Sequence, residues 1–461
     1  MPKQDKQFRY GQLRNEFPYF IYETYHIMVT DIGIEVVYHF NLAGRYHFYP
    51  SFILPMREFY RLGKAEEIMA DIRMQNLIFH IGMVELVSYW KAACPPQVII
   101  KPFKLVPEQI KWWKEIYFQG LGEFFYLNSI VPDKHSFMQI ECATAKPTEH
   151  FDIYLDDKLI IPVGGGKDSV VTLELLSPHF DTLALIMNPR GASLLTAEAA
   201  GYSRDHVIEI NRTIDPLLLE LNKQDFLNGH TPFSALLAFQ CLLASALTGR
   251  RHIALSNESS ANEATIEDMQ INHQYSKSIT FEADFRWYVA RYISPAFNYF
   301  SFLRPLNELQ IGRLFAGFPA YFDIFKSCNV GSKTDIWCGH CPKCLFAFII
   351  LSPFISRDRM VKIFGKDMFA VEALWPYLRQ LSGLDDIKPF ECVGTIDEVK
   401  LALQIILEGR GQEELPVLLM RFAESISSAH YHPGLLHTLL NEFNEEHFLQ
   451  NDFLSILKKA I

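Results

Sequence analysis

Short apolar runs alternate with helix-like stretches along the middle of the chain. The runs LIIPV, TLALIM, HVIEI and HIALS, at residues 159–163, 182–187, 206–210 and 252–256, are typical of strands buried on both faces. Helix-like segments separate these runs. The pattern predicts an α/β fold with a helix-wound parallel sheet over residues 151–394, in which ligands bind at the carboxyl ends of the strands.

The two flanking regions have other patterns. Alternating residues at 26–40 and 45–54, with a short break at NLAG, predict antiparallel strands, and helical periodicity follows at 65–90 and 107–127 around a short strand at 98–100. We therefore expect an N-terminal α+β domain at 1–150, ending in a polar linker at 143–150, and a helical region at 395–461.

Composition and charge narrow the class of protein. The chain has 461 residues, of which 49% are hydrophobic and 21% charged, as expected for a folded protein of two or three domains. The longest apolar stretch, at 231–249, carries Ser234, Gln240 and Ser245, so we expect a core helix and no membrane span. The first residues lack an apolar export segment, which predicts a cytoplasmic protein. A net charge of −10 counts against a nucleic-acid partner.

A glycine-rich loop follows the first predicted strand of the middle region. Its residues are Gly164, Gly165, Gly166, Lys167, Asp168 and Ser169. Consecutive glycines allow positive φ and expose backbone N–H groups, and a helix N-terminus directly after them favours an anion. The segment resembles the pyrophosphatase loop SGGKDS of enzymes that split ATP between the α and β phosphates, with Gly164 in place of the first Ser.

That resemblance implies roles for two of these residues. Lys167 would neutralise the leaving pyrophosphate, while Asp168 would cap the helix and help to hold Mg²⁺. The alternative is a solvated Lys167–Asp168 pair at a turn. A second stretch, SNESSANE at 256–263, resembles another signature of the same enzymes, in which Asn257, Glu258 and Asn262 would face the nucleotide. Without that context it is a polar turn.

Four cysteines crowd into a short segment. Cys328, Cys338, Cys341 and Cys344 offer four thiolates, and two-residue gaps allow a turn to bring paired sulfurs to one tetrahedral Zn²⁺. Such a closed site would be structural. An iron–sulfur cluster is an alternative, and His340 or Cys392 could replace one ligand.

Further motifs extend the resemblance. NGHTPFSALLAF, SNESSANE, NHQYSKS, FLRPLNEL, WCGHCPKC and KPFECVG, in this order between residues 228 and 394, resemble bacterial UDP-N-acetylmuramoyl-L-alanyl-L-glutamate epimerases. The resemblance implies conversion of the terminal L-Glu of UDP-MurNAc-L-Ala-L-Glu to D-Glu through an acyl-adenylate, with ATP and Mg²⁺ consumed and AMP and diphosphate released.

Candidate catalytic residues come from these motifs. In NHQYSKS, His273 and Lys277 could point to one side of a loop or strand, and His230 of NGHTP is a further acid–base candidate. Arg304 of FLRPLNEL is suited to bind a carboxylate or phosphate, or it pairs with Glu308 one turn later. A histidine in a structural hydrogen bond is the alternative for each His. Because the substrate is anionic and the protein acidic, basic residues such as Lys277, Arg304 and Lys333 would have to offset the field.

Two other functions compete with the epimerase. The Cys spacing and the loop also occur in 7-cyano-7-deazaguanine synthases, so an enzyme that modifies a nucleobase or tRNA is the alternative. A zinc-containing regulator that binds ATP without turnover is the third hypothesis, and its support is the missing first Ser of the loop.

Overall fold

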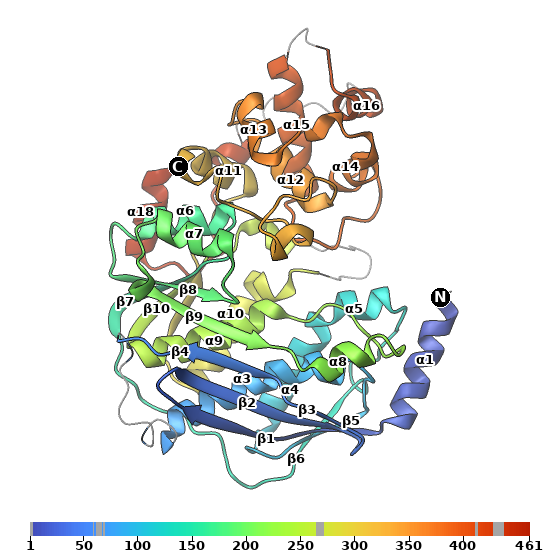
Figure 1. The fold of residues 1–461 in the computed structure, drawn as a ribbon, viewed down its shortest axis with the longest axis vertical. Helices are drawn as coiled ribbons and strands as arrows, with labels where there is room; N and C mark the ends of the chain where they lie inside the picture. Colours follow the sequence, from blue (N-terminus) through green and yellow to red (C-terminus); the bar gives the residue numbers. More distant parts are fainter. Residues whose placement is uncertain are drawn as a thin grey trace. The chain divides into compact units, whose positions relative to one another are not determined.

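The structure is a computed structural model that describes residues 3–58, 60, 67, 70–263, 272–410, 414–426 and 438–461. The chain divides into two compact units (Figure 1). Unit 1 comprises Met1–Ile160, Ile208–Ile253 and Tyr275–Tyr299, and unit 2 comprises Ile161–Val207, Ala254–Gln274 and Phe300–Ile461. The predicted division at 150 and 394 stays a prediction.

Unit 1 contains the antiparallel strands predicted near the N-terminus. The strands are β1 (Tyr19–Val29), β2 (Gly33–Leu42), β3 (Tyr46–Phe48), β4 (Ser51–Pro55), β5 (Gln97–Ile100), β6 (Gln139–Cys142) and β9 (Val207–Thr213). Their order is β9-β4-β2-β1-β5-β6, with β3 beside β2. β1, β2, β3 and β4 pair antiparallel, and β5 is parallel to β1. A turn at Thr30–Gly33, closed by a 2.9 Å hydrogen bond, separates β1 from β2.

Helices cover these strands in unit 1. They are α1 (Lys3–Glu16), α3 (Ile72–Trp90), α4 (Pro107–Gly120), α5 (Gly122–Leu127), α8 (Pro216–Leu221), α9 (Phe233–Thr248) and α10 (Ile279–Tyr292). The apolar stretch at 231–249 forms the buried helix α9, as predicted, and this helix packs on α3. α3 begins after Asp71, whose carboxylate accepts the Arg73 N–H at 2.8 Å. The earlier part of the helix predicted at 65–90 lies largely outside the described residues.

Further parallel pairing involves β7 (Asp156–Pro162). Within unit 1 this strand lies beside β10 (Arg250–Leu255), which is followed in the order by β11 (Asn298–Ser301). In unit 2 the Val163 N–H donates to the Leu185 carbonyl at 2.8 Å, which aligns β8 (Thr182–Met187) with the end of β7. The mixed, largely parallel sheet with alternating helices confirms the predicted α/β class.

Unit 2 carries the helices that follow the strands and the C-terminal helices (Figure 1). They are α6 (Lys167–Leu176), α7 (Gly191–Ala199), α11 (Glu308–Ala316), α12 (Pro342–Leu351), α13 (Arg357–Phe364), α14 (Trp375–Leu381), α15 (Ile396–Arg410), α16 (Val417–Ser425) and α18 (Asn451–Ala460). α12 packs against α11, α14 and α15, and α6 packs against α11 and α18. The described part of 395–461 contains α15, α16 and α18, in agreement with the predicted helical region.

Short 3₁₀ turns complete the two units. They are η1 (Arg204–His206), η2 (Ser259–Asn262), η4 (Tyr275–Lys277), η5 (Pro319–Tyr321), η6 (Val330–Lys333), η7 (Met368–Ala370) and η8 (Glu372–Leu374). Within the part of the chain that the structure describes, no helix combines the length and the apolar character needed to cross a bilayer.

Candidate functional site

The glycine loop leaves the end of β7 and enters α6. Gly165 has φ of +82°, and a Cβ added there would lie 2.8 Å from the Ser193 backbone nitrogen, so this position requires glycine. A Cβ added at Gly164 would meet nothing within 4 Å. The loop is held from outside, because the Lys326 N–H donates to the Gly165 carbonyl at 2.8 Å. The open side of Gly164 leaves room for a ligand or a small side chain.

The start of α6 corrects one expectation about Asp168. Gly166 is the N-cap residue, with extended backbone angles, and Asp168 lies inside the first turn. Its carboxylate contacts the Lys167 ammonium instead of a helix N–H. An acidic group in the first turn is still favourable there, because of the helix dipole. The Ser169 hydroxyl donates to the Gly166 carbonyl at 2.8 Å.

Lys167 is the central charge of this site. Its ammonium contacts the carboxylates of both Asp168 and Glu308, and its side chain is only 6% exposed. Burial lowers the pKa of Lys167, but Asp168 and Glu308 outweigh it and hold the pKa above its ordinary value. Lys167 is therefore a buried, charged lysine at a helix N-terminus, and the solvated pair considered for the sequence does not describe it.

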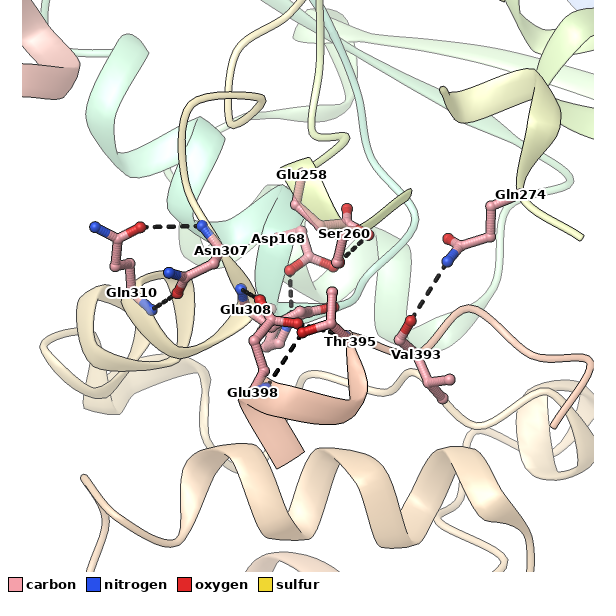
Figure 2. Close-up of polar contacts among 11 residues, drawn as sticks. Asp168, Glu258, Ser260, Gln274, Asn307, Glu308, Gln310, Val393, Thr395 and Glu398 are labelled. Carbon is pink, nitrogen blue, oxygen red and sulfur yellow. Dashed lines mark hydrogen bonds and ion pairs between the residues drawn. The ribbon is translucent and has the colours of Figure 1, made fainter. Parts of the chain in front are cut away.

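Carboxylates surround this lysine. Figure 2 shows Asp168, Glu258, Glu308 and Glu398 gathered near the start of α11. Burial raises the pKa of Glu308 against the effect of Lys167, and Asp168, Glu258 and Glu398 raise it further. Asp168, Glu258 and Glu398 therefore make the surroundings of the Lys167–Glu308 pair acidic. A bound polyphosphate would need additional positive charge at this place.

The second motif is anchored by Arg304. Arg304 has no exposed surface, and its guanidinium donates to the Glu258 carbonyl at 2.6 Å and to the Ser301 hydroxyl at 3.3 Å. The Asn257 side-chain amide donates to the same hydroxyl at 3.0 Å. Asn262 is exposed at the end of η2. In this structure Arg304 supports the loop that carries Glu258, while Glu308 pairs with Lys167.

The four cysteines of the Cys-rich segment converge. One sulfur from each of Cys328, Cys338, Cys341 and Cys344 lies within 4.8 Å of the others. The Cys328–Cys341 and Cys338–Cys344 sulfur distances are 3.9 and 3.7 Å. A tetrahedron with zinc–sulfur bonds of about 2.3 Å has edges of about 3.8 Å, so the geometry fits a single tetrahedral ion.

Backbone groups complete the surroundings of these sulfurs. The Gly331 N–H donates to Cys328 Sγ at 3.1 Å and the Cys344 N–H to Cys341 Sγ at 3.4 Å. Hydrogen bonds from the neighbouring thiols, above all Cys344, lower the pKa of Cys341. His340 Nδ1 lies 2.8 Å from the Cys338 carbonyl, and four thiols already fill a tetrahedral set. A multi-iron cluster would hold the thiolates farther apart.

The Cys-rich segment also supports the helix beside the loop. The Asp335 carboxylate accepts the N–H groups of Gly191 and Ala192 at 3.0 and 2.9 Å, at the start of α7. Arg190 donates to the Ser332 hydroxyl at 2.6 Å. Lys333 is exposed at the end of η6. An ion bound by the cysteines would thus stabilise a segment that contacts both the glycine loop and α7.

The acid–base candidates are divided between the units. His273, in unit 2, is half-buried with its ring edge-to-face against Phe390 at 6.4 Å. Lys277, in unit 1, ends the 3₁₀ turn η4. His273 and Lys277 therefore lie in a loop and a 3₁₀ turn instead of a strand, and their shared orientation stays a prediction. His230, in unit 1, lies with Nδ1 3.6 Å from the Glu123 carboxylate.

The loop before His230 is tied down by three contacts within unit 1. The Leu227 N–H donates to the Ala92 carbonyl at 2.9 Å, and the Asn128 amide to the Asn228 carbonyl at 3.0 Å. The Lys91 ammonium donates to the Gly229 carbonyl. Burial, with help from Arg212, lowers the pKa of Lys91 to about 8. No sequence pattern pointed to Lys91 or Glu123, because both lie next to apolar helical stretches.

Three further residues at the lysine site were missed. Glu308 lay inside a quoted motif, but only as an alternative partner for Arg304. Lys388 contacts Glu263 and donates to the Gly394 carbonyl at 2.9 Å. Glu398 comes from the C-terminal region, which showed no obvious chemistry. The pattern Thr395-x-x-Glu398 before an apolar run is a capping-box signature that could have found it.

Comparisons with known proteins cover both units. The family models for the MurL N-terminal domain and the MurL C-terminal domain match residues 12–302 and 324–432. Three curated proteins named UDP-N-acetyl-alpha-D-muramoyl-L-alanyl-L-glutamate epimerase are similar to the chain. The protein of Salinispora tropica is 35% identical over 77% of this chain and 78% of its own length. Those of Micromonospora sp. and Xanthomonas oryzae pv. oryzae are 35% and 34% identical, over 73% and 77% of this chain and 76% and 79% of their own lengths. No solved structure matches.

Proposed function

The chain belongs to the MurL family, and from this membership we propose that it is an ATP-dependent epimerase of UDP-MurNAc-L-Ala-L-Glu. It would convert the terminal L-Glu to D-Glu and act in the synthesis of a peptidoglycan precursor, in the cytoplasm. The observation that carries this proposal is the identity of about a third, over about three quarters of the chain, with three relatives of that name. The nucleobase or tRNA alternative shares the Cys spacing and the glycine loop, but the three named relatives favour the epimerase.

The proposed reaction explains why an epimerase would consume ATP. Removing the α-proton next to a carboxylate builds a second negative charge beside the first. If a carboxylate oxygen attacks the α-phosphorus and the bond to the β-phosphate oxygen breaks, diphosphate leaves and the acyl-adenylate carries no carboxylate charge. A base can then take the α-proton, an acid returns one to the opposite face, and water releases AMP and the D-Glu product. Acid–base groups contribute roughly 10²–10⁴-fold to such a step.

The glycine loop and Lys167 are suited to the first half of this reaction. The exposed amides at Gly164 to Gly166 and the N-terminus of α6 would bind the phosphates. Lys167 would balance charge on the leaving diphosphate. Because Lys167 already contacts Asp168 and Glu308, we propose that nucleotide binding exchanges one of these carboxylates for phosphate oxygen.

Metal ions would supply the missing positive charge and stability. Carboxylate oxygens are the ligands that Mg²⁺ prefers, and Asp168 and Glu258 would hold it beside the phosphates. Held there, Mg²⁺ would supply positive charge between the phosphates and the surrounding carboxylates. We assign the cysteine site to structural Zn²⁺, because its four sulfurs match a closed tetrahedral set.

We propose His230, His273 and Lys277 as the groups from which the acid and base are drawn. Glu123 lies close enough to His230 to orient its ring, as the third member of a catalytic constellation commonly does. Arg304 would act indirectly, through its hydrogen bond to the Glu258 carbonyl. Asn257 and Asn262 would face the bound nucleotide and complete its binding site.

One incubation tests the proposal. Purified, metallated protein is mixed with ATP, Mg²⁺ and UDP-MurNAc-L-Ala-L-Glu, and AMP release and the chirality of the recovered glutamate are followed. AMP together with D-Glu is the expected result. A folded protein that binds ATP but yields neither product would overturn it. Lys167→Met is the matched variant, since it should abolish both products together.

A further inference from the structure

The carboxylate of Glu398 joins the starts of two helices in unit 2. One oxygen accepts the N–H of Glu308, the first residue of α11, at 2.7 Å. The other accepts the N–H of Thr395, just before α15, at 2.5 Å. In return the Glu398 N–H donates to the Thr395 hydroxyl at 3.2 Å. Figure 2 shows this arrangement beside Asp168.

The contact with Glu308 goes beyond a helix cap. A capping box needs only the reciprocal Thr395–Glu398 bonds. The second oxygen of Glu398 instead satisfies the N–H of Glu308, a residue 90 positions earlier in the chain. Because Asn307 caps the Gln310 N–H at 3.0 Å, Glu398 and Asn307 together satisfy two different N–H groups at the start of α11. Glu398 is 1% exposed, so water does not replace these bonds.

Close packing at Gly394 fixes the two carboxylates relative to each other. A Cβ added at Gly394 would lie 2.5 Å from the Glu398 carboxylate and 3.0 Å from the Glu308 Cγ. Only glycine permits this approach of backbone to both side chains. The Lys388 ammonium holds the Gly394 carbonyl at 2.9 Å from the other side.

The C-terminal segment secures the same helix start at a second place. The Asn307 amide donates to the Leu439 carbonyl at 2.6 Å, and the Gln310 amide to the Glu442 carbonyl at 2.8 Å. The Asn444 N–H donates to the Pro305 carbonyl at 2.9 Å. The region after residue 394 therefore determines where α11 begins.

We propose that Glu398 is a positioning residue for Lys167: it fixes the first residue of α11 so that the Glu308 carboxylate meets the loop ammonium. The chain of contacts runs from α15 through Glu398 to the Glu308 backbone, and from the Glu308 side chain to Lys167. This inference rests on the proposed function where it concerns ATP turnover. If the inference is right, the C-terminal region supports the nucleotide site indirectly, through the contact between Glu398 and the Glu308 backbone.

Glu398→Gln tests this role in the full-length, metallated protein. Glutamine keeps the size but offers an N–H₂ group to one of the two backbone N–H donors, so one bond is lost. We expect the kcat for AMP formation to fall about 10- to 100-fold, because small displacements of catalytic groups cost that much, while the KM for ATP stays near the wild-type value. Hydrogen exchange should rise in peptides covering the start of α11 and the glycine loop.

Thr395→Val is the matched control, since it removes the cap hydroxyl but leaves the Glu398–Glu308 contact. It should lower the Tm by a few degrees and raise exchange in α15, with kcat close to wild type. A folded Glu398→Gln protein with wild-type kcat and unchanged exchange at α11 would overturn the proposal. An equal loss of kcat in Thr395→Val would also overturn it, because a cap alone would then explain the effect.

Two further measurements keep the test decisive. If the Gln variant does not fold, Glu398→Asp keeps the charge but shortens the reach, and full activity in that variant would contradict positioning. If the wild-type protein forms no AMP with the UDP-muramoyl dipeptide, the proposed function fails by itself. The exchange experiment then decides the positioning role alone: increased exchange at α11 and the loop supports it, and unchanged exchange rejects it.

Discussion

The backbone N–H of Lys326 donates a 2.8 Å hydrogen bond to the carbonyl of Gly165, and so ties the Cys-rich segment to the glycine loop. Ser327, the residue after Lys326, is also close to the loop, because a Cβ added at Gly166 would lie 2.8 Å from the Ser327 hydroxyl. Cys328, which directly follows Ser327, begins the sulfur cluster. The glycine loop therefore contacts a segment in which four thiols converge.

Loss of the Zn²⁺ proposed at the four cysteines should weaken the proposed binding of ATP. Cys341→Ser removes one of four ligands, and we expect loss of the metal, a lower Tm and a higher Kd for ATP, because the Lys326–Gly165 contact loosens. Metal content by mass spectrometry and ATP affinity by calorimetry check this. Cys142→Ser, in β6, is the control and should keep its metal. Unchanged ATP affinity in the metal-free protein would contradict the coupling.

The first two glycines of the loop should tolerate substitution very differently. Gly165→Ala places a side chain at φ of +82° against the Ser193 backbone, and should cost about 1–3 kcal/mol in unfolding free energy and reduce ATP affinity. Gly164→Ser has open space and restores the hydroxyl of the resembling loops, so stability should stay near wild type and diphosphate affinity should not fall. Thermal unfolding and diphosphate binding measure both. Similar losses in the two variants would refute this account.

The contribution of Lys167 to stability should be separable from its contribution to AMP formation. Lys167→Met leaves the buried Glu308 carboxylate without its lysine, and breaking such a pair costs about 3–5 kcal/mol. The double variant Lys167→Met with Glu308→Gln should recover much of the stability, since the buried charge is also gone. AMP formation should remain absent in both variants. Denaturant unfolding and AMP assays check the two parts, and a double variant as unstable as the single one would disprove the pairing argument.

Lys91 should make the free energy of unfolding vary with pH in the alkaline range. Its folded pKa of about 8 lies below the unfolded value of about 10.4, so the unfolded chain binds more protons between them. Burial destabilises the folded state only when Lys91 is charged. This cost is absent above the unfolded pKa and returns as pH falls toward about 8, so the protein is more stable at the alkaline end. Relative to Lys91→Met, the free energy of unfolding of the wild-type protein should rise by about 3 kcal/mol as pH increases across this range. Urea unfolding from pH 8 to 10.5 tests it, with the exposed-site variant Lys111→Met as control.

The proposed acid–base residues should separate ATP cleavage from inversion. His230→Gln and His273→Gln leave the glycine loop unchanged, so AMP should still form while D-Glu and solvent deuterium at the glutamate Cα fall about 10²–10⁴-fold. AMP, D-Glu and deuterium are measured in one reaction. For either histidine, normal deuterium incorporation would exclude it as a proton-transfer group. Lys277→Gln tests the third candidate in the same way.

Local sequence patterns determined many of the elements and identified the cysteines that converge. The apolar run TLALIM forms β8 over the same residues, Thr182–Met187, because a strand buried on both faces needs a short continuous apolar run. The apolar stretch ending at Gly249 forms α9, and that glycine takes a left-handed cap at φ of 68°. Cys338, Cys341 and Cys344 were identifiable because two-residue spacing itself restricts how thiolates can meet.

Tertiary structure decided the partners of the buried charges. Asp168 was expected to cap α6 and Arg304 to bind an anion, yet Asp168 contacts Lys167 and Arg304 donates to the Glu258 carbonyl. Lys167 and Glu308 are separated by 141 positions in the sequence, and Glu308 and Glu398 by 90, yet each pair is in contact. Periodicity reports which face of an element is buried, but it carries no information on which distant charge lies opposite. A buried lysine must find its carboxylates wherever the packing of helices places them, and only the folded chain determines that choice.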